Sequence, residues 1–177
     1  MPDSLPAKPL ILCLGNEIIS DDGFGAVIAE RLNADAELIA VVDVIFAAVA
    51  GFALIDLLKD RPRALILDTI QTIGGIPGTL HQFSADLLVP GKNLTTSHQI
   101  SLPTAIELGK RLGANMPENI DILAVEASDL TTLSESLTPA IEAAVPEAIR
   151  LVREWVLHQE SQDLLSARSD ATVISLH

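Results

Sequence analysis

The sequence predicts an α/β fold, a three-layer αβα single domain with a mostly parallel twisted sheet and one candidate antiparallel edge strand. Short apolar runs alternate with longer helical patterns, which favours parallel strands joined by helices. Hydrophobic residues make up 49% of the 177 residues, enough for a substantial core, but only 3% are aromatic. A core of Ala, Leu, Ile and Val suits buried parallel strands covered by helices.

The first half of the chain holds three expected strands and two expected helices. Leu10 to Leu14 is apolar throughout, as in a fully buried strand, and we expect Cys13 within it to be a buried structural thiol. The expected elements that follow are a helix from Gly23 to Leu32, a strand from Leu38 to Ile45, a helix from Gly51 to Lys59, and a strand from Ala64 to Leu67 that ends at Asp68.

The second half begins with a Gly/Pro-rich loop at 74–78 and ends in a long helix. Pro139 suits the first turn of that helix, whereas Pro146 should kink it or divide it in two. We assign residues 1–160 to the single domain and residues 161–177 to a C-terminal tail that is mobile or reaches a partner. The expected elements are an edge strand from Thr79 to Phe83, a helix from Leu102 to Leu112, a strand from Ile120 to Val125, and a helix from Pro139 to Leu157.

Composition excludes several classes of function. A formal net charge of -13 disfavours binding to nucleic acid or to an anionic membrane, and its simplest role is solubility. Cys13 is the single cysteine, so no internal disulfide forms, which is consistent with a reducing compartment. The N-terminus has no signal-peptide pattern, and no apolar run approaches the roughly 20 residues that span a bilayer. We therefore expect a cytoplasmic protein without membrane insertion.

The loop after the first strand, Gly15 to Gly25, carries two consecutive carboxylates. Its glycine spacing differs from G-x-G-x-x-G, and the acids stand where a pyrophosphate would bind, so we expect no organic cofactor. One residue of Ser20, Asp21 and Asp22 is expected to cap the following helix. Asp22 is then left to face the crevice at the end of the sheet. Taken alone, the loop supports capping and a functional site about equally.

Asp68 and His98 bring further polar groups to the same crevice. Asp68 directly follows a buried strand, where it either opens an Asx turn or faces the site. His98 lies among polar neighbours before an expected helix. With Asp22 they form an oxygen and nitrogen donor set that suits zinc, nickel or iron and leaves positions open. Neither an HExxH pair nor a G-x-S-x-G elbow is present, which excludes a zincin and counts against an ordinary serine hydrolase.

Several short motifs follow one another in a specific order. In this ordered combination the sequence resembles the hydrogenase maturation endopeptidase family, over nearly the whole chain up to about Leu157. The motifs are Leu14-Gly15-Asn16, Ser20-Asp21-Asp22-Gly23-Phe24-Gly25, Leu65-Ile66-Leu67-Asp68, Pro77-Gly78-Thr79, Ser97-His98-Gln99-Ile100 and Leu137-Thr138-Pro139.

The resemblance implies an activity, a partner and a set of site residues. It implies an endopeptidase that removes the C-terminal extension of a nickel-loaded [NiFe] hydrogenase large-subunit precursor. The nickel is then a recognition element that the substrate supplies. The implied residues are Asp22 and Asp68 for catalysis, Asp22, Asp68 and His98 for metal contact, and Asn16, Gly51 and Gln99 for substrate binding.

One loop departs from the family pattern. Members usually carry an Asp-Gly-Gly-Thr-x-Gly-like loop after the second strand, and here Phe46-Ala47-Ala48-Val49-Ala50-Gly51 keeps only Gly51 clearly. Asp43 lies nearby but is shifted onto the strand. Because of this departure, the sequence does not identify which hydrogenase is the substrate. It also leaves two alternatives, a nickel-dependent chaperone or docking factor that does not cut, and another α/β hydrolase that uses the same crevice.

Overall fold

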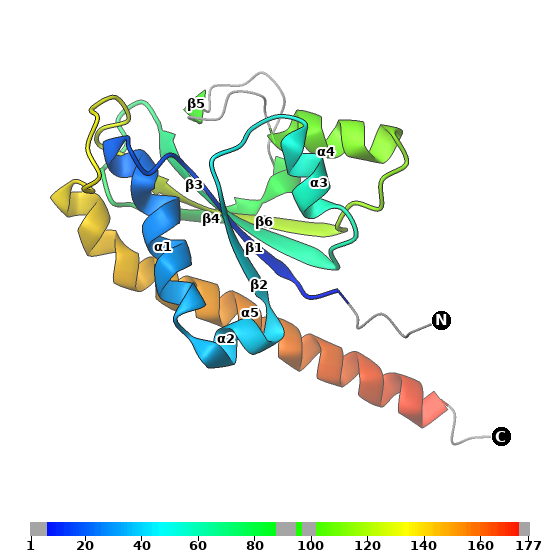
Figure 1. Ribbon diagram of the computed structural model, residues 1–177. Helices are drawn as coiled ribbons and strands as arrows, with labels where there is room; N and C mark the ends of the chain where they lie inside the picture. The colour runs from blue at the N-terminus through cyan, green and yellow to red at the C-terminus, as the bar shows by residue number, and fades with distance from the viewer. Residues whose placement is uncertain (1–6, 88–94, 97–101, 174–177) are drawn as a thin grey trace.

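The computed structural model contains one twisted sheet with helices on both faces (Figure 1). It describes residues 7–87, 95–96 and 102–173. The strands are β1 (Leu10–Leu14), β2 (Asp43–Ala47), β3 (Arg63–Gln71), β4 (Leu80–Ser84), β5 (Thr95–Thr96) and β6 (Asn119–Glu126). Their order is β2-β1-β3-β6-β4, with β5 paired to β3. The first four strands of that order run parallel to one another. Strand β4 pairs antiparallel with β6, and β5 pairs antiparallel with β3. The predicted fold class, including the antiparallel edge strand β4, is confirmed.

Two hydrophobic layers hold the helices on the sheet. Alternate residues of a strand point to opposite faces. In β1, Ile11 and Cys13 therefore pack under α1 and α5, while Leu10 and Leu12 pack toward α3 and α4 (Figure 1). The helices are η1 (Ser20–Gly23), α1 (Phe24–Asn33), α2 (Ala36–Val41), α3 (Ala53–Leu58), η2 (Ala85–Leu87), α4 (Leu102–Arg111) and α5 (Pro139–Val173).

Cys13 is fully buried in the middle of this packing. Burial raises the pKa of its thiol to about 12, so the thiol stays protonated at neutral pH. A protonated, inaccessible thiol is neither a nucleophile nor a metal ligand. The prediction that Cys13 is structural is confirmed.

The prediction of a strand from Leu38 to Ile45 is wrong in its first half. Residues 36–41 form helix α2, and the strand begins only at Asp43. The cause is Asp35, whose carboxylate accepts hydrogen bonds from the backbone N–H groups of Glu37 (3.1 Å) and Leu38 (3.2 Å). This N-cap satisfies two amides that otherwise lack partners in a first turn, and it outweighs the β propensity of the apolar run.

Two other boundaries differ from expectation. Asp68 does not end its strand, because β6 continues to pair with β3 as far as Ile70 and Glu126. Helix α5 is not divided at Pro146 and runs on to Val173, past the predicted end at Leu157. Pro146 and Glu142, the residue whose carbonyl loses its helical donor, are both exposed, so water can satisfy that carbonyl.

The connections create one reversal of strand order. From β1 the chain moves outward to β2 and then crosses back to β3, on the other side of β1. In open α/β sheets, ligands bind beyond the carboxyl ends of the strands at such a reversal. The fold therefore directs attention to the carboxyl ends of β1 and β3. Within the described residues no helix is long and apolar enough to cross a membrane.

Candidate functional site

Asp22 and Asp68 both lie at this reversal, and both are bonded to Thr69. The carboxylate of Asp22 accepts a hydrogen bond from the Thr69 hydroxyl (3.0 Å), and that of Asp68 accepts one from the Thr69 backbone N–H (2.8 Å). All three residues are buried; Asp22 is 3% and Asp68 is 7% exposed. The structure therefore brings two acids that are 46 positions apart in the sequence to one residue.

The two carboxylates reach Thr69 from different sides of the sheet. Asp68 alternates with Thr69 along β3, so the two side chains point to opposite faces of the sheet. Asp68 shares the face of Ile66 and Ile70, which pack toward α3 and α4, and Thr69 shares the face of Leu67, which packs under α1. Strand β1 ends at this level, and its last register pair with β3 is Cys13 with Leu67. On this side of β3 the next pairing among the described residues is that of β5 with Ile70.

The predicted helix cap by Ser20, Asp21 or Asp22 does not form. No side chain caps η1 or α1. The fully buried carboxylate of Asp21 instead accepts hydrogen bonds from the backbone N–H groups of Ser128 (2.8 Å), Asp129 (2.8 Å) and Thr138 (2.7 Å), and from the Thr138 hydroxyl (3.1 Å). Asp21 thus fixes the loop between β6 and α5 against the first loop.

Glu126, at the end of β6, is a fourth buried acid of this edge, and the sequence analysis missed it. Its carboxylate accepts hydrogen bonds from the Thr72 backbone N–H (2.5 Å) and hydroxyl (3.0 Å), and it lies 3.6 Å from Nε2 of His81. A Cβ on Gly75 would come within 2.1 Å of the carboxylate, so the turn closes tightly around it. The same reasoning that selected Asp68, an acid directly after a buried apolar run, also selects Glu126.

The predicted substrate-binding residues have different outcomes. The Asn16 side-chain carbonyl accepts a hydrogen bond from the Ile18 N–H (3.2 Å), which shapes the first loop. Gly51 is buried with φ 65°, a left-handed conformation that favours glycine, just before α3. His98 and Gln99 lie outside the described residues.

The described residues do not form a complete metal site by themselves. Among them, no group of three or more His, Cys, Asp and Glu side chains is arranged to hold a metal ion. Asp22 and Asp68 supply oxygen donors only. A metal held here by three or more ligands would take its further donors from outside the described ranges or from a bound partner.

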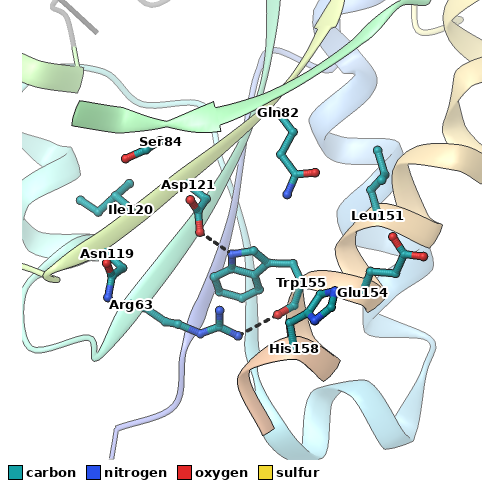
Figure 2. A pocket seen from close by; sticks show the side chains of 10 residues that line it. All are labelled: Arg63, Gln82, Ser84, Asn119, Ile120, Asp121, Leu151, Glu154, Trp155 and His158. Carbon is teal, nitrogen blue, oxygen red and sulfur yellow. Dashed lines mark hydrogen bonds between the residues drawn. The ribbon is translucent and has the colours of Figure 1, made fainter. Parts of the chain in front are cut away.

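A concave region lies at the opposite, amino end of the sheet (Figure 2). We call it the amino-end pocket; it has a volume of about 400 Å³. The Arg63 guanidinium lies 3.5 Å from the centre of the Trp155 ring and donates a hydrogen bond to the Trp155 carbonyl (3.0 Å). The Trp155 indole N–H donates to Asp121 (2.7 Å). These contacts join α5 to the first residues of β3 and β6.

Comparison with known sequences finds one family. Residues 26–155 match the hydrogenase maturation protease family. The hydrogenase expression/formation protein HupD of Rhodobacter capsulatus is 27% identical over 161 residues, which cover 88% of this chain and 76% of HupD. The hydrogenase 2 maturation protease of Escherichia coli is 27% identical over 145 residues, with 81% and 87% of the two chains covered.

Solved structures share the fold. The hydrogenase maturating endopeptidase HybD from E. coli superposes with a TM-score of 0.73 at 23% identity, and the match covers 86% of this chain and 93% of HybD. The [NiFe] hydrogenase maturation protease HybD from Thermococcus kodakarensis gives a TM-score of 0.65 at 23% identity, with 84% and 99% covered. The matches extend over most of each chain, so the likeness concerns the whole domain.

Proposed function

The chain belongs to the hydrogenase maturation protease family and is a peptidase, and from this premise we propose that it trims a [NiFe] hydrogenase large-subunit precursor. The reaction is hydrolysis of the peptide bond that joins the C-terminal extension to the mature subunit. Nickel already present in the precursor is the recognition element. The observation that supports this most is the meeting of Asp22 and Asp68 at Thr69.

Buried acids at this place favour a role in binding or chemistry. Burying a carboxylate costs free energy unless it is hydrogen-bonded, paired or coordinated to a metal. Thr69 donates a hydrogen bond to each of the two carboxylates. Carboxylate oxygens combined with imidazole nitrogen suit nickel and other divalent transition metals.

We propose His98 as the third contact to the nickel of the precursor. β5 pairs antiparallel with β3, with Thr95 opposite Gln71 and Thr96 opposite Ile70, so the chain in β5 advances toward Asp68. His98 follows Thr96 by two positions in the sequence. Its imidazole would supply the nitrogen donor that the two acids lack.

In the proposed reaction, the three side chains contact nickel in the precursor and thereby place the scissile bond in the crevice. A water oxygen attacks the peptide carbonyl carbon, its proton passes to a base, and the carbon–nitrogen bond breaks as the amine takes up a proton. Asp22 or Asp68 acts as that base, or the nickel polarises the water; both routes fit the donor set. A precursor without nickel would not be held in register, and misplacement alone can cost large factors in rate.

Three further residues complete the proposal. Asn16 and Gly51 shape the loops after β1 and β2, and with Gln99 they would contact the precursor chain near the scissile bond. The protein itself needs no organic cofactor and no resident metal in this scheme. We place the step in the cytoplasm, in line with the single buried thiol of Cys13.

The test is incubation of the purified protein with nickel-loaded and nickel-free large-subunit precursor, followed by mass measurement of the precursor. We expect a shortened product only with the loaded form. Equal cleavage of both forms would contradict nickel recognition. A loaded precursor that binds but keeps its mass would favour the docking-factor alternative.

A further inference from the structure

Large apolar side chains are exposed on the loops that surround the candidate site. Five of the ten exposed large apolar residues among the described ones lie on the loops at the carboxyl ends of β1, β2, β3 and β6. They include the three most exposed of all, Ile73 at 106%, Leu133 at 77% and Ile76 at 73%. We call the five residues the apolar rim: Ile18, Phe52, Ile73, Ile76 and Leu133.

Hydrogen bonds hold the loops that carry four of the five rim residues, Ile18, Ile73, Ile76 and Leu133. Ile73 and Ile76 belong to the turn that closes around the Glu126 carboxylate through Thr72. Leu133 lies beside the first loop, because Ile19 and Leu133 form an isolated bridge and the Ser134 N–H donates to the Ile18 carbonyl (3.1 Å). The exposed side chains are thus presented on fixed loops, which limits the entropy lost when a partner covers them.

The charge around the rim has one sign. The loops at 15–23, 48–52, 72–79 and 127–138 contain no Lys and no Arg. They carry five acids, of which Glu17 and Glu135 are exposed. By contrast, Lys59, Lys110 and Arg111 lie at or just after the far ends of α3 and α4. The negative charge of these four loops is therefore not offset by any Lys or Arg within them.

From these two features together we infer that the apolar rim is a docking surface for a protein face that carries Lys or Arg beside apolar side chains. The inference rests on the proposed function, and the face belongs to the hydrogenase precursor. Apolar contact at the centre with opposite charges around it is the usual composition of a specific interface. Contacts outside the scissile segment would add affinity for the folded precursor that a short peptide does not have.

The experiment measures the dissociation constant of nickel-loaded precursor for wild-type protein and for paired variants, at low and at high salt. The rim variant is I73S/I76S, and its matched control is L87S/L112S, which removes two apolar side chains, each 71% exposed, away from the rim. The charge variant is E17K/E135K, and its control is E37K/E118K, which changes exposed acids away from this edge.

We expect I73S/I76S to weaken binding at least about tenfold at both salt concentrations, because apolar contact is not screened. E17K/E135K should weaken binding at low salt, with a smaller effect at high salt. Both controls should bind as the wild type does. Melting temperatures equal to that of the wild type would show that each variant is folded.

Three outcomes overturn the inference, and they differ in what they say about the proposed function. Wild-type binding by I73S/I76S, with cleavage retained, removes the docking surface and leaves the peptidase proposal intact. Equal weakening of precursor binding by I73S/I76S and by its control L87S/L112S also removes the docking surface and leaves the peptidase proposal intact. If the wild type neither binds nor shortens the precursor, the proposed function fails and the docking surface fails with it.

Discussion

Among the described residues at the carboxyl end of the sheet, the buried charged groups are all acids, namely Asp21, Asp22, Asp68 and Glu126. At the amino end the buried charged residue is Arg63, which is stacked on Trp155 beside Asp121. At the amino end a cation lies on an aromatic ring whose indole N–H donates to a carboxylate, an arrangement that stabilises the fold by itself. The carboxyl end gathers like charges, which costs stability and is expected where binding or catalysis requires them.

The same difference appears within the carboxyl end itself. Asp21 accepts four hydrogen bonds from the loop between β6 and α5, whereas the Asp22 carboxylate accepts one from Thr69. Two neighbouring acids therefore have separate tasks. Substitution of Asp21 should mainly change stability, and substitution of Asp22 should mainly change activity.

The largest expected effect is on cleavage. D22N and D68N keep the shape and hydrogen-bond acceptor of each side chain but remove its charge. We expect each to lower the cleavage rate of nickel-loaded precursor at least about 100-fold, since a missing base or metal contact costs on that order. Mass spectrometry of the precursor over time measures it. Near wild-type rates in both variants would remove these residues from the site.

D21A is expected to act on stability. It leaves three backbone N–H groups and the Thr138 hydroxyl without their acceptor. Each buried group left unsatisfied costs about 1–3 kcal/mol, so the free energy of unfolding should fall by about 3 kcal/mol or more. Urea denaturation measures this loss. D21N, which retains one acceptor oxygen, should lose less; equal stability of D21A and wild type would contradict the anchoring role.

W155F tests the amino end. It removes the indole N–H that donates to Asp121 and reduces the ring surface under Arg63. We expect the free energy of unfolding to fall by about 2 kcal/mol, while the folded variant cleaves the precursor at the wild-type rate. A tenfold lower rate in folded W155F would show that the two ends do not have separate roles.

T69V has the smallest expected effect of the four. It removes the hydroxyl that donates to Asp22 and keeps the backbone N–H that donates to Asp68. A hydrogen bond to a carboxylate contributes about 1.5 kcal/mol or more, so we expect roughly a tenfold lower cleavage rate. T69S restores the hydroxyl and should restore the rate. If T69S is as slow as T69V, packing of the methyl group and not the hydrogen bond is the cause.

Much of the fold could be predicted because its elements are defined locally. The run from Leu10 to Leu14 gave β1 without error, and the apolar spacing of residues 23–32 gave α1. The prediction of a strand from Leu38 to Val41 was wrong because an apolar run of that length suits a helix or a strand. The group that decides for the helix, the Asp35 carboxylate, lies outside the run.

The site was predictable only in part, for a physical reason of the same kind. The rule that parallel strands share a carboxyl edge placed Asp22 and Asp68 together, and His98 stays a prediction outside the described residues. The partners of Asp21 follow it by more than 100 positions, and Arg63 and Trp155 are 92 positions apart. No local pattern encodes such tertiary contacts.

The claim that Asp22 and Asp68 act as one site is tested most directly by the cleavage rates of D22N, D68N and the double variant D22N/D68N on nickel-loaded precursor. Groups that act as a unit give losses that do not multiply. We expect the double variant to be about as slow as the slower single variant. A loss equal to the product of the two single losses would show that the carboxylates act independently, and would contradict a shared site.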